Sequence, residues 1–243
     1  MDAYSRTRFL LGDDGMMKLK NAHVAVFGLG GVGGYVAEAL ARSGVGTLTL
    51  VDHDTISETN INRQILATTD TVGMDKAEAA AQRVKAINPD IKIYPRKTFY
   101  LPDTADQFDF AEYDYVVDAI DTVTGKLMLV QAAQAAGTPI ISSMGTGNKL
   151  DPTAFRVGDI SQTSVCPLAR IIRKECKKRG IKKLKVVWST EDPIACDLPE
   201  GDPAWAELPE GRNALPGSVC FVPATAGMIL AGEVIKDIVK ASP

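Results

Sequence analysis

The chain has 243 residues, of which 45% are hydrophobic and 23% are charged, and its formal net charge is -3. This length suits one large α/β domain with a small lobe added, and the mild acidity argues against a protein that binds nucleic acid over its whole surface. The N-terminus lacks the apolar core of a secretory signal, and no stretch reaches the ~20 apolar residues that span a bilayer. We therefore expect a soluble, cytoplasmic protein without a membrane partner.

Short β-rich runs alternate with helical patterns through the first 150 residues. Strands are predicted at residues 23–27, 47–52, 91–94, 115–117 and 139–142, and helices at residues 32–42, 76–87 and 126–136. Strands that alternate with helices of this length indicate βαβ units around a buried parallel sheet. The predicted fold class is therefore α/β, a Rossmann-like doubly wound and mainly parallel sheet.

The pattern changes after Asp151. Strands are predicted at 155–160 and 185–189 around a basic helix at 167–179, and residues 192–217 form a loop rich in Pro, Gly and acidic residues, of a length that is usually functional or mobile. Residues 224–240 are predicted to close the chain as an amphipathic helix. Its expected buried face consists of Met228, Ile229, Val234, Ile235, Ile238 and Val239. We accordingly divide the chain into a main domain at 1–150 and a small α/β extension at 151–243 that packs on it.

A glycine-rich turn follows the first predicted strand and opens the first helix. In the pattern GxGGVG, formed by Gly28, Gly30, Gly31 and Gly33, the first glycine allows a tight turn, the second lets the backbone approach a phosphate, and the last lets the helix pack on the strand. The exposed amides and the helix dipole favour an anion there. Asp52 ends the second strand, where a carboxylate accepts hydrogen bonds from ribose hydroxyls. These features predict a bound nucleotide and leave NAD and ATP open.

Three downstream features favour ATP. Arg63 lies among amide side chains just after the ribose carboxylate, Lys76 begins the next helix, and Asp118 and Asp121 follow the fourth strand at the mouth of the sheet. A triphosphate under attack needs cations to neutralise developing charge and a carboxylate to hold Mg²⁺. Each residue also has a structural interpretation, namely a solvated loop for Arg63, an exposed helix start for Lys76 and a helix N-cap for Asp121. Together with the glycine turn they predict ATP and Mg²⁺, with Arg63, Lys76 and Asp121 as catalytic residues.

The ordered motifs GxGGVG, LVDHDTIxxxNxNRQ, VGMDKAE, INP and DAIDT resemble the ubiquitin-activating-enzyme superfamily, which includes the ThiF and MoeB adenylyltransferases. The resemblance implies Asp52 on the ribose, Asn62 with Arg63 and Lys76 around the phosphates, and Asp121 on Mg²⁺. The predicted ATP contacts are Gly28, Gly30, Gly31, Gly33, Asp52, Asp54, Asn62, Arg63, Gln64, Lys76 and Asp121. The resemblance further implies a homodimer in which an N-terminal arginine, Arg8 or alternatively Arg6, reaches the ATP of the partner subunit.

The cysteines and the C-terminal third of the chain indicate which branch of this superfamily the chain resembles. Sulfur-carrier adenylyltransferases of this superfamily carry CxxC pairs for zinc, and this chain has none. Cys196, the most exposed candidate nucleophile, has acidic neighbours that disfavour a thiolate, so a catalytic cysteine is not expected. The ordered motifs DPT, VGDI, PLA, WSTE, GS and FVPA from residue 151 onward resemble the tRNA threonylcarbamoyladenosine dehydratases. That branch cyclises a modified adenosine in tRNA anticodon loops.

This resemblance implies ATP-dependent dehydration through an acyl-adenylate. The substrate carboxylate attacks the α-phosphate, and a nitrogen of the substrate's own carbamoyl group then displaces AMP. The second step is intramolecular, so it needs no protein nucleophile. The alternatives are an adenylyltransferase acting on the C-terminal glycine of a ubiquitin-like sulfur carrier, an NAD-dependent oxidoreductase and a non-catalytic nucleotide-binding module. The resemblance also allows a sulfur-relay or carrier protein as a further partner.

A run of nine cations against one acid between residues 170 and 185 suggests where tRNA docks. Leu168, Ile171, Ile172 and Cys176 have helical spacing, so one stripe can pack while the cations face outward. A solvated helix face is the structural alternative. Contacts of this kind supply sequence-independent, salt-sensitive affinity for a phosphate backbone. The predicted tRNA-binding residues are Arg173, Lys174, Lys177, Lys178 and Lys182.

Overall fold

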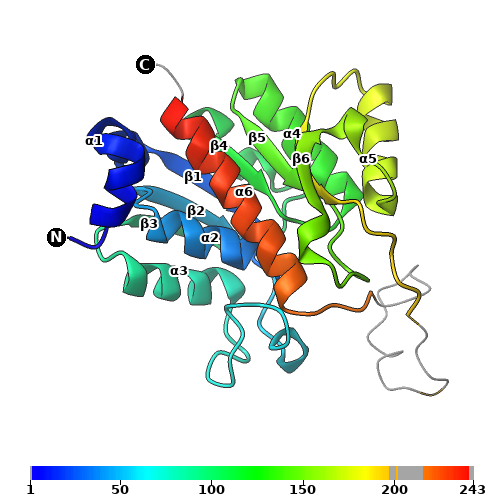
Figure 1. The fold of residues 1–243 in the computed structure, drawn as a ribbon, viewed down its shortest axis with the longest axis horizontal. Helices are drawn as coiled ribbons and strands as arrows, with labels where there is room; N and C mark the ends of the chain where they lie inside the picture. Colours follow the sequence, from blue (N-terminus) through cyan, green and yellow to red (C-terminus); the bar gives the residue numbers. More distant parts are fainter. Residues whose placement is uncertain (1, 197–200, 202–215, 241–243) are drawn as a thin grey trace.

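The computed structural model describes residues 2–196, 201 and 216–240 and is built around a seven-stranded sheet (Figure 1). The strand order is β3-β2-β1-β4-β5-β7-β6; the pairs from β3 to β7 are parallel, and β6 pairs antiparallel with β7. The strands are β1 His23–Phe27, β2 Thr47–Val51, β3 Lys92–Arg96, β4 Tyr115–Asp118, β5 Ile140–Ser143, β6 Phe155–Asp159 and β7 Lys185–Ser189. This arrangement confirms the predicted doubly wound, mainly parallel α/β fold.

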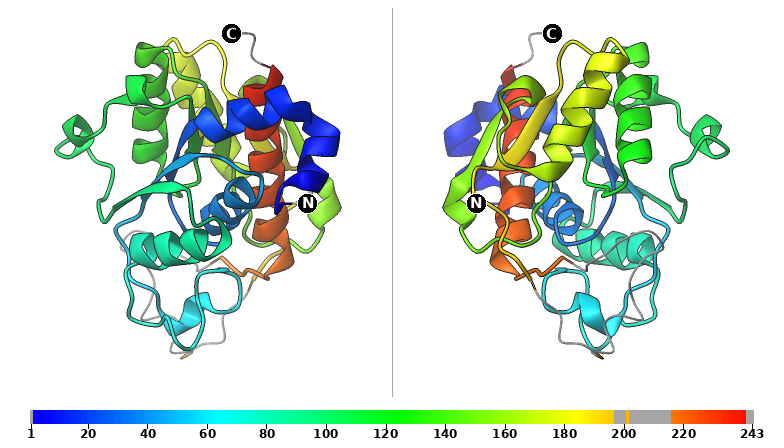
Figure 2. Two further views of the ribbon diagram at one scale, coloured as in Figure 1. Left: turned by 90° about the vertical axis from the view of Figure 1, so that its left-hand side faces the viewer. Right: turned by 90° about the vertical axis from the view of Figure 1, so that its right-hand side faces the viewer.

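Helices cover both faces of the sheet, as Figure 2 shows. One layer contains α1, α2, α3 and α6, and the opposite layer contains α4 and α5. The helices are α1 Ser5–Asn21, α2 Gly33–Arg42, α3 Lys76–Ile87, α4 Val123–Ala136, α5 Pro167–Lys178 and α6 Phe221–Lys240. Single 3-10 turns lie at Glu58–Asn60, Ala105–Gln107, Phe110–Glu112, Pro152–Ala154 and Ile160–Gln162.

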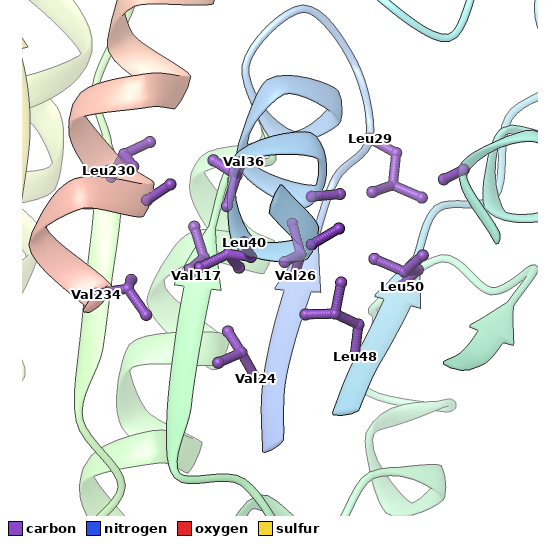
Figure 3. Packing of buried hydrophobic residues seen from close by; sticks show 14 of the residues in the cluster. Val24, Val26, Leu29, Val36, Leu40, Leu48, Leu50, Val117, Leu230 and Val234 are labelled. Carbon is purple, nitrogen blue, oxygen red and sulfur yellow. The ribbon is translucent and has the colours of Figure 1, made fainter. Parts of the chain in front are cut away.

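The central strands β1 and β4 are largely apolar because both of their faces are buried. In β1, Val24 and Val26 belong to the core under α2, whereas Ala25 and Phe27 belong to the core on the other face. Figure 3 shows Val36 and Leu40 of α2 near Val26 of β1 and Val117 of β4, with Leu230 and Val234 of α6 on the other side of Val117. The last helix of the chain therefore completes the core that the first βαβ unit begins.

The strand order creates a crevice at one edge of the sheet. The chain runs outward from β1 to β3 and then returns to place β4 on the other side of β1. The connections on the two sides diverge where the strand order reverses, and ligands of doubly wound sheets bind there, beyond the carboxyl ends of the strands. The glycine turn after β1, Asp52 after β2 and Asp121 after β4 all lie at this edge.

Three details differ from the sequence predictions. Helix α1, with a kink at Gly12, was not predicted, because its apolar residues form no continuous stripe. Met228 was expected to be buried but is 46% exposed, and α6 instead buries smaller residues such as Ala226 and Ala231. Ile171 was expected in the packed stripe of α5 but is 45% exposed.

The extension at 151–243 contributes β6 and β7 to the same sheet as the first 150 residues, and α6 packs against α1 and α2. The division of the chain at residue 150 stays a prediction. Most of the predicted 192–217 loop lies outside the described residues. Among the helices that the structure describes, none is long and apolar enough to cross a membrane.

Candidate nucleotide-binding site

A cavity of about 740 Å³ opens at the crevice between β1 and β4. It brings together most of the residues predicted to contact ATP: Gly28, Gly30, Gly31, Asp52, Asp54, Arg63, Gln64, Lys76 and Asp121. Gly33 and Asn62 lie outside its described lining, as do Arg8 and the basic residues of α5. Nine of the predicted residues therefore lie around one cavity, and their contact with a nucleotide stays a prediction.

The glycines of the turn have different physical roles. Gly28 has a φ of 87°, and a Cβ there would lie 2.7 Å from the carbonyl oxygen of Ala119. A Cβ on Gly33 would lie 1.7 Å from the carbonyl oxygen of Gly28, so this residue permits the first turn of α2 to pack on the strand end. The neighbour closest to a Cβ on Gly30 would be Gln64 Nε2, at 3.8 Å, which leaves the backbone open toward the cavity. These roles are those that a phosphate-binding turn requires.

The Asp52 carboxylate is held by two backbone amides. Its oxygens accept hydrogen bonds from the N–H of Leu29 at 2.6 Å and of Asp54 at 2.9 Å, and the residue is 8% exposed. An ionised carboxylate can accept about four hydrogen bonds, so capacity remains for a ligand. The geometry fits a group that accepts hydrogen bonds from ribose hydroxyls.

Lys76 is buried at the cavity wall, so the interpretation as an exposed helix start is wrong. Its ammonium lies 2.7 Å from Oδ2 of Asp54, and its backbone N–H donates to the Asp54 carbonyl. His53 Nε2 lies 3.1 Å from the other oxygen of Asp54. Lys76 is therefore held at a defined position with its charge directed toward the nucleotide region.

Arg63 is oriented by the loop that follows β2. Its Nη1 donates to the Thr59 carbonyl at 2.8 Å and to Asn62 Oδ1 at 2.9 Å. Asn62 in turn donates from Nδ2 to the Ser218 carbonyl at 3.1 Å, which ties this loop to the segment before α6. Asn62 thus supports the Arg63 side chain, while its predicted contact with the phosphates stays a prediction.

Two further observations bear on ligand fit. Gln64 Oε1 is buried at the cavity without a hydrogen-bond partner among the described residues, a state that usually indicates a missing ligand or water. Asp121 lies in the cavity wall just before α4, whose N-cap is Thr122, so the interpretation of Asp121 as the N-cap is wrong. A carboxylate in that position is the oxygen donor that Mg²⁺ prefers. The cavity therefore fits both a nucleotide and its metal ion.

Asp118, the other carboxylate expected at the mouth of the sheet, is instead part of a buried network. It is fully buried and forms an ion pair with Lys126 of α4 at 3.1 Å. The Lys126 ammonium also donates to the Ser143 carbonyl at 2.7 Å and to Ser142 Oγ at 3.3 Å. Sequence reasoning missed this network, although a lysine at a buried helical position of α4 was a usable signal. Asp118 is therefore not available to a ligand.

Aromatic residues form part of the cavity wall. Tyr100 lines the cavity and packs against Phe27 and Phe108. Burial raises the pKa of Tyr100 to about 12, with a smaller contribution from Tyr113. Its hydroxyl therefore stays neutral near pH 7. This residue was also missed by the sequence reasoning.

The other end of the cavity is formed by segments that the sequence reasoning did not assign to a binding site. The segment 144–149 after β5, the N-terminal end of α5 at 166–168 and residues 216–218 line it. Cys166 is buried in this part of the cavity wall. Cys196 is exposed and outside the described lining, and its Sγ lies 3.3 Å from Asn148 Oδ1. This end of the cavity, called the second compartment below, is continuous with the end at the glycine turn.

The predicted tRNA-binding residues differ in how free they are. Lys174, Lys177 and Lys182 are exposed, without a hydrogen bond or ion pair among the described residues. Lys178 forms an ion pair with Glu175 at 2.8 Å. Arg173 is half-buried and donates to the carbonyl and hydroxyl of Thr163 at 2.7 and 2.6 Å, so its guanidinium mainly supports the fold. Since α5 begins at the cavity wall, its exposed cations extend away from the cavity mouth.

The doubly wound sheet and the glycine turn at the cavity define a Rossmann-like nucleotide-binding protein. The ThiF family profile matches residues 4–243, and the chain belongs to the ThiF family. This finding confirms the family predicted from the motifs.

The relatives of known name agree with the predicted branch. The chain is 42% identical over 240 residues to tRNA threonylcarbamoyladenosine dehydratase of Bacillus subtilis strain 168, covering 98% of this chain and 94% of that protein. It is 36% identical over 251 residues to the dehydratase of Escherichia coli strain K12, covering 97% and 92%. A crystal structure of the E. coli dehydratase in complex with ATP matches with a TM-score of 0.85 and 33% identity, covering 97% of this chain and 93% of that chain.

Proposed function

We propose that this protein dehydrates threonylcarbamoyladenosine in tRNA at the expense of ATP. The observation that supports this proposal best is that one cavity contains Asp52, Arg63 and Lys76 at one end. Its other end lies against the first residues of the basic helix α5. The near full-length similarity to dehydratases, one of them solved with ATP, supports the same reaction. A modified nucleoside fits the second compartment while its tRNA backbone contacts the cations outside it.

In the proposed reaction the substrate carboxylate attacks the α-phosphorus of ATP, and pyrophosphate leaves. A nitrogen of the carbamoyl group then attacks the activated carbonyl and loses its proton, while AMP leaves with the carboxylate oxygen. The net change in the tRNA is the loss of one water. Proximity accelerates the ring closure, so the chemistry requires no cysteine nucleophile.

The residues of the cavity have separate roles in this proposal. Arg63 and Lys76 offset the negative charge that develops on the phosphates. Asp121 would hold Mg²⁺, which would supply further charge neutralisation when bound. Asp52 binds the ribose and so orients the α-phosphate. A substrate made in tRNA also implies a cytoplasmic location, as expected from the sequence.

We further propose a homodimer in which Arg8 reaches the partner's ATP. Arg8 is directed by Asp2 and lies 3.7 Å from Asp13, and it is outside the described lining of its own cavity. The adjacent Phe9 and Leu10 are 76% and 87% exposed, which suits a surface covered by a second subunit. Mixing Arg8→Ala and Asp121→Ala subunits tests this arrangement. If Arg8 contacts the partner's ATP, an equal mixture of the two variants should recover roughly a quarter of wild-type activity. About half of the dimers in such a mixture contain one subunit of each variant, and each of these dimers has one intact site out of two. No recovery would contradict it.

Mass spectrometry of tRNA nucleosides before and after incubation with the protein and ATP tests the proposed function. We expect threonylcarbamoyladenosine to lose one water in the presence of wild-type protein and to remain unchanged with Asp121→Ala, whose fold is checked by circular dichroism. Pyrophosphate exchange that a ubiquitin-like carrier protein stimulates and modified tRNA does not would instead establish the carrier adenylyltransferase.

A further inference from the structure

Lys149 is a buried cation at the end of the cavity away from the ribose carboxylate. It is 4% exposed, lines the cavity and has no hydrogen bond or ion pair from its side chain among the described residues. The other buried lysines of the described chain are paired: Lys76 with Asp54, and Lys126 with Asp118. Its ammonium is not among the fully buried polar atoms of the described chain, so it is open to the cavity, where an anionic ligand would supply the counter-charge that the described residues do not.

The backbone around Lys149 is held on both sides. Asn148 has a φ of 59°, its N–H donates to the Gly217 carbonyl, and its carbonyl accepts from the N–H of Ile194, both at 2.8 Å. Leu150 donates its N–H to a carboxylate oxygen of Glu191 at 2.9 Å. These hydrogen bonds connect residues 148–150, after β5, to residues 191–194, after β7, and to Gly217, before α6. The position of the lysine is therefore set before any ligand binds.

The strand order places Lys149 on the side of the second substrate. Lys149 follows β5, whereas Asp52 follows β2, and β1 and β4 lie between them. Three spacings of about 4.8 Å separate these strands by roughly 14 Å. Arg63 and Lys76 supply the cations on the ribose side. Buried Met144 and Cys166 line the cavity near the same segment, and an apolar wall strengthens the attraction between opposite charges.

We propose that the Lys149 ammonium binds the carboxylate of the substrate, the group that is to be adenylated. This inference rests on the proposed function and names the residue that recognises the carboxylate-bearing modification. An unmodified adenosine offers no anion in that position. Lys149 therefore distinguishes a carboxylate-bearing nucleoside from its unmodified counterpart and positions the attacking oxygen.

The test compares Lys149→Met, which keeps length and removes charge, with Lys149→Arg, which keeps charge. For Lys149→Met we expect kcat/KM for modified tRNA to fall at least about 30-fold, since loss of one partner of a buried charge pair has effects of this size. The Kd for ATP should stay within about twofold, and the thermal midpoint should equal or exceed that of the wild type, because an unpaired buried charge is removed. Lys149→Arg should recover part of the loss.

A binding measurement tests whether Lys149 binds the carboxylate independently of the reaction. Calorimetry with threonylcarbamoyladenosine nucleoside and its methyl ester should show that wild-type protein prefers the free acid and that Lys149→Met does not. If wild-type protein leaves modified tRNA unchanged, the proposed function fails, and the ester comparison still decides the role of Lys149. Weaker ATP binding with an unchanged preference for the acid would assign Lys149 to a nucleotide phosphate and overturn the inference. So would a lowered thermal midpoint with unchanged kinetics.

Discussion

The carboxylate of Asp52 accepts a hydrogen bond from the backbone N–H of Leu29, at 2.6 Å, and thereby connects the end of β2 to the glycine turn after β1. The same carboxylate accepts from the N–H of Asp54, whose side chain pairs with Lys76. The carboxylate predicted to bind the ribose, the glycine turn and Lys76, predicted to lie at the phosphates, therefore form one connected unit. Changes in this unit should affect nucleotide affinity and stability together.

Asp52→Asn should weaken ATP binding at least about tenfold and lower the free energy of unfolding by about 1–3 kcal/mol. The amide nitrogen cannot accept from Leu29 or Asp54, so a buried N–H is left without its partner. Calorimetry with ATP and urea denaturation measure the two effects. Asp70→Asn, at an exposed position outside the described cavity lining, is the control and should change neither. Normal ATP affinity in Asp52→Asn would contradict the ribose assignment.

Gly30→Ala and Gly33→Ala should separate binding from folding. A Cβ at position 30 meets no atom closer than 3.8 Å, so stability should change by only about 0.5 kcal/mol while ATP affinity falls, since the methyl group occupies the approach to the phosphates. A Cβ at position 33 would lie 1.7 Å from a carbonyl oxygen, and the resulting strain should destabilise the fold by about 1–3 kcal/mol or more. Thermal denaturation with and without ATP distinguishes them. Equal stability of both variants would be inconsistent with this geometry.

Lys126→Met should lower the free energy of unfolding by about 3–5 kcal/mol, because it leaves the fully buried Asp118 carboxylate without its counter-charge. The double variant Lys126→Met/Asp118→Asn should recover part of this loss, since no buried charge remains. Urea denaturation of the wild type, Lys126→Met, Asp118→Asn and the double variant gives the four unfolding free energies of a double-mutant cycle. Additive losses would show that the two side chains do not interact.

Lys185 should give stability a dependence on pH. Burial lowers the pKa of Lys185, but hydrogen bonds to Asp237 and Glu233 outweigh it and raise the pKa above 10.5. This stabilisation is present below pH 10.5 and is lost as the pH rises through the folded-state value. For Glu233, burial raises the pKa, but hydrogen bonds from Lys185 and Lys236 outweigh this effect and lower the pKa below 4.5. The stabilisation that Glu233 contributes is therefore present above pH 4.5 and is lost as the pH falls through its folded-state pKa.

Lys185→Met should therefore be less stable than the wild type by about 1 kcal/mol at neutral pH. The difference should shrink above pH 10.5 and below pH 4.5. Unfolding free energies across this range measure it. A difference that is constant at every pH would mean that packing of the Lys185 side chain, and not its charge, stabilises the contact between β7 and α6.

The exposed cations of α5 and the following turn should contribute to tRNA affinity. Replacing Lys174, Lys177 and Lys182 by Ala should weaken binding uniformly across tRNA sequences and reduce the slope of log Kd against log salt by about 0.7–0.9 for each phosphate that is no longer neutralised. ATP affinity should not change. The matched control replaces Lys20, Lys92 and Lys240, which are exposed elsewhere on the molecule. An equal effect of both triple variants would show that net charge, and not this surface, determines the affinity.

Local features of the sequence were sufficient for the nucleotide half of the site. The glycine spacing, the acid at the end of the second strand and the alternation of strands and helices depend on residues close together in the chain, so their geometry follows from backbone conformation and side-chain period. The predictions for Asp52, Lys76 and Asp121 therefore placed these residues at one cavity. The doubly wound, mainly parallel sheet was also predicted correctly, because βαβ connections allow few topologies.

Contacts between distant segments were decided only by the tertiary structure. A sequence pattern shows that Lys126 and Lys149 occur near apolar residues, but not that Asp118 neutralises one and no described side chain neutralises the other. The exposure of Met228 was equally unpredictable, because it depends on how α6 crosses α2. Periodicity determines which face of an element is apolar, whereas the partner of a buried charge depends on which elements the fold brings together. For this protein, the sequence by itself therefore determined which residues were expected around a nucleotide, whereas only the tertiary structure showed that Lys149 is buried at the same cavity without a described partner.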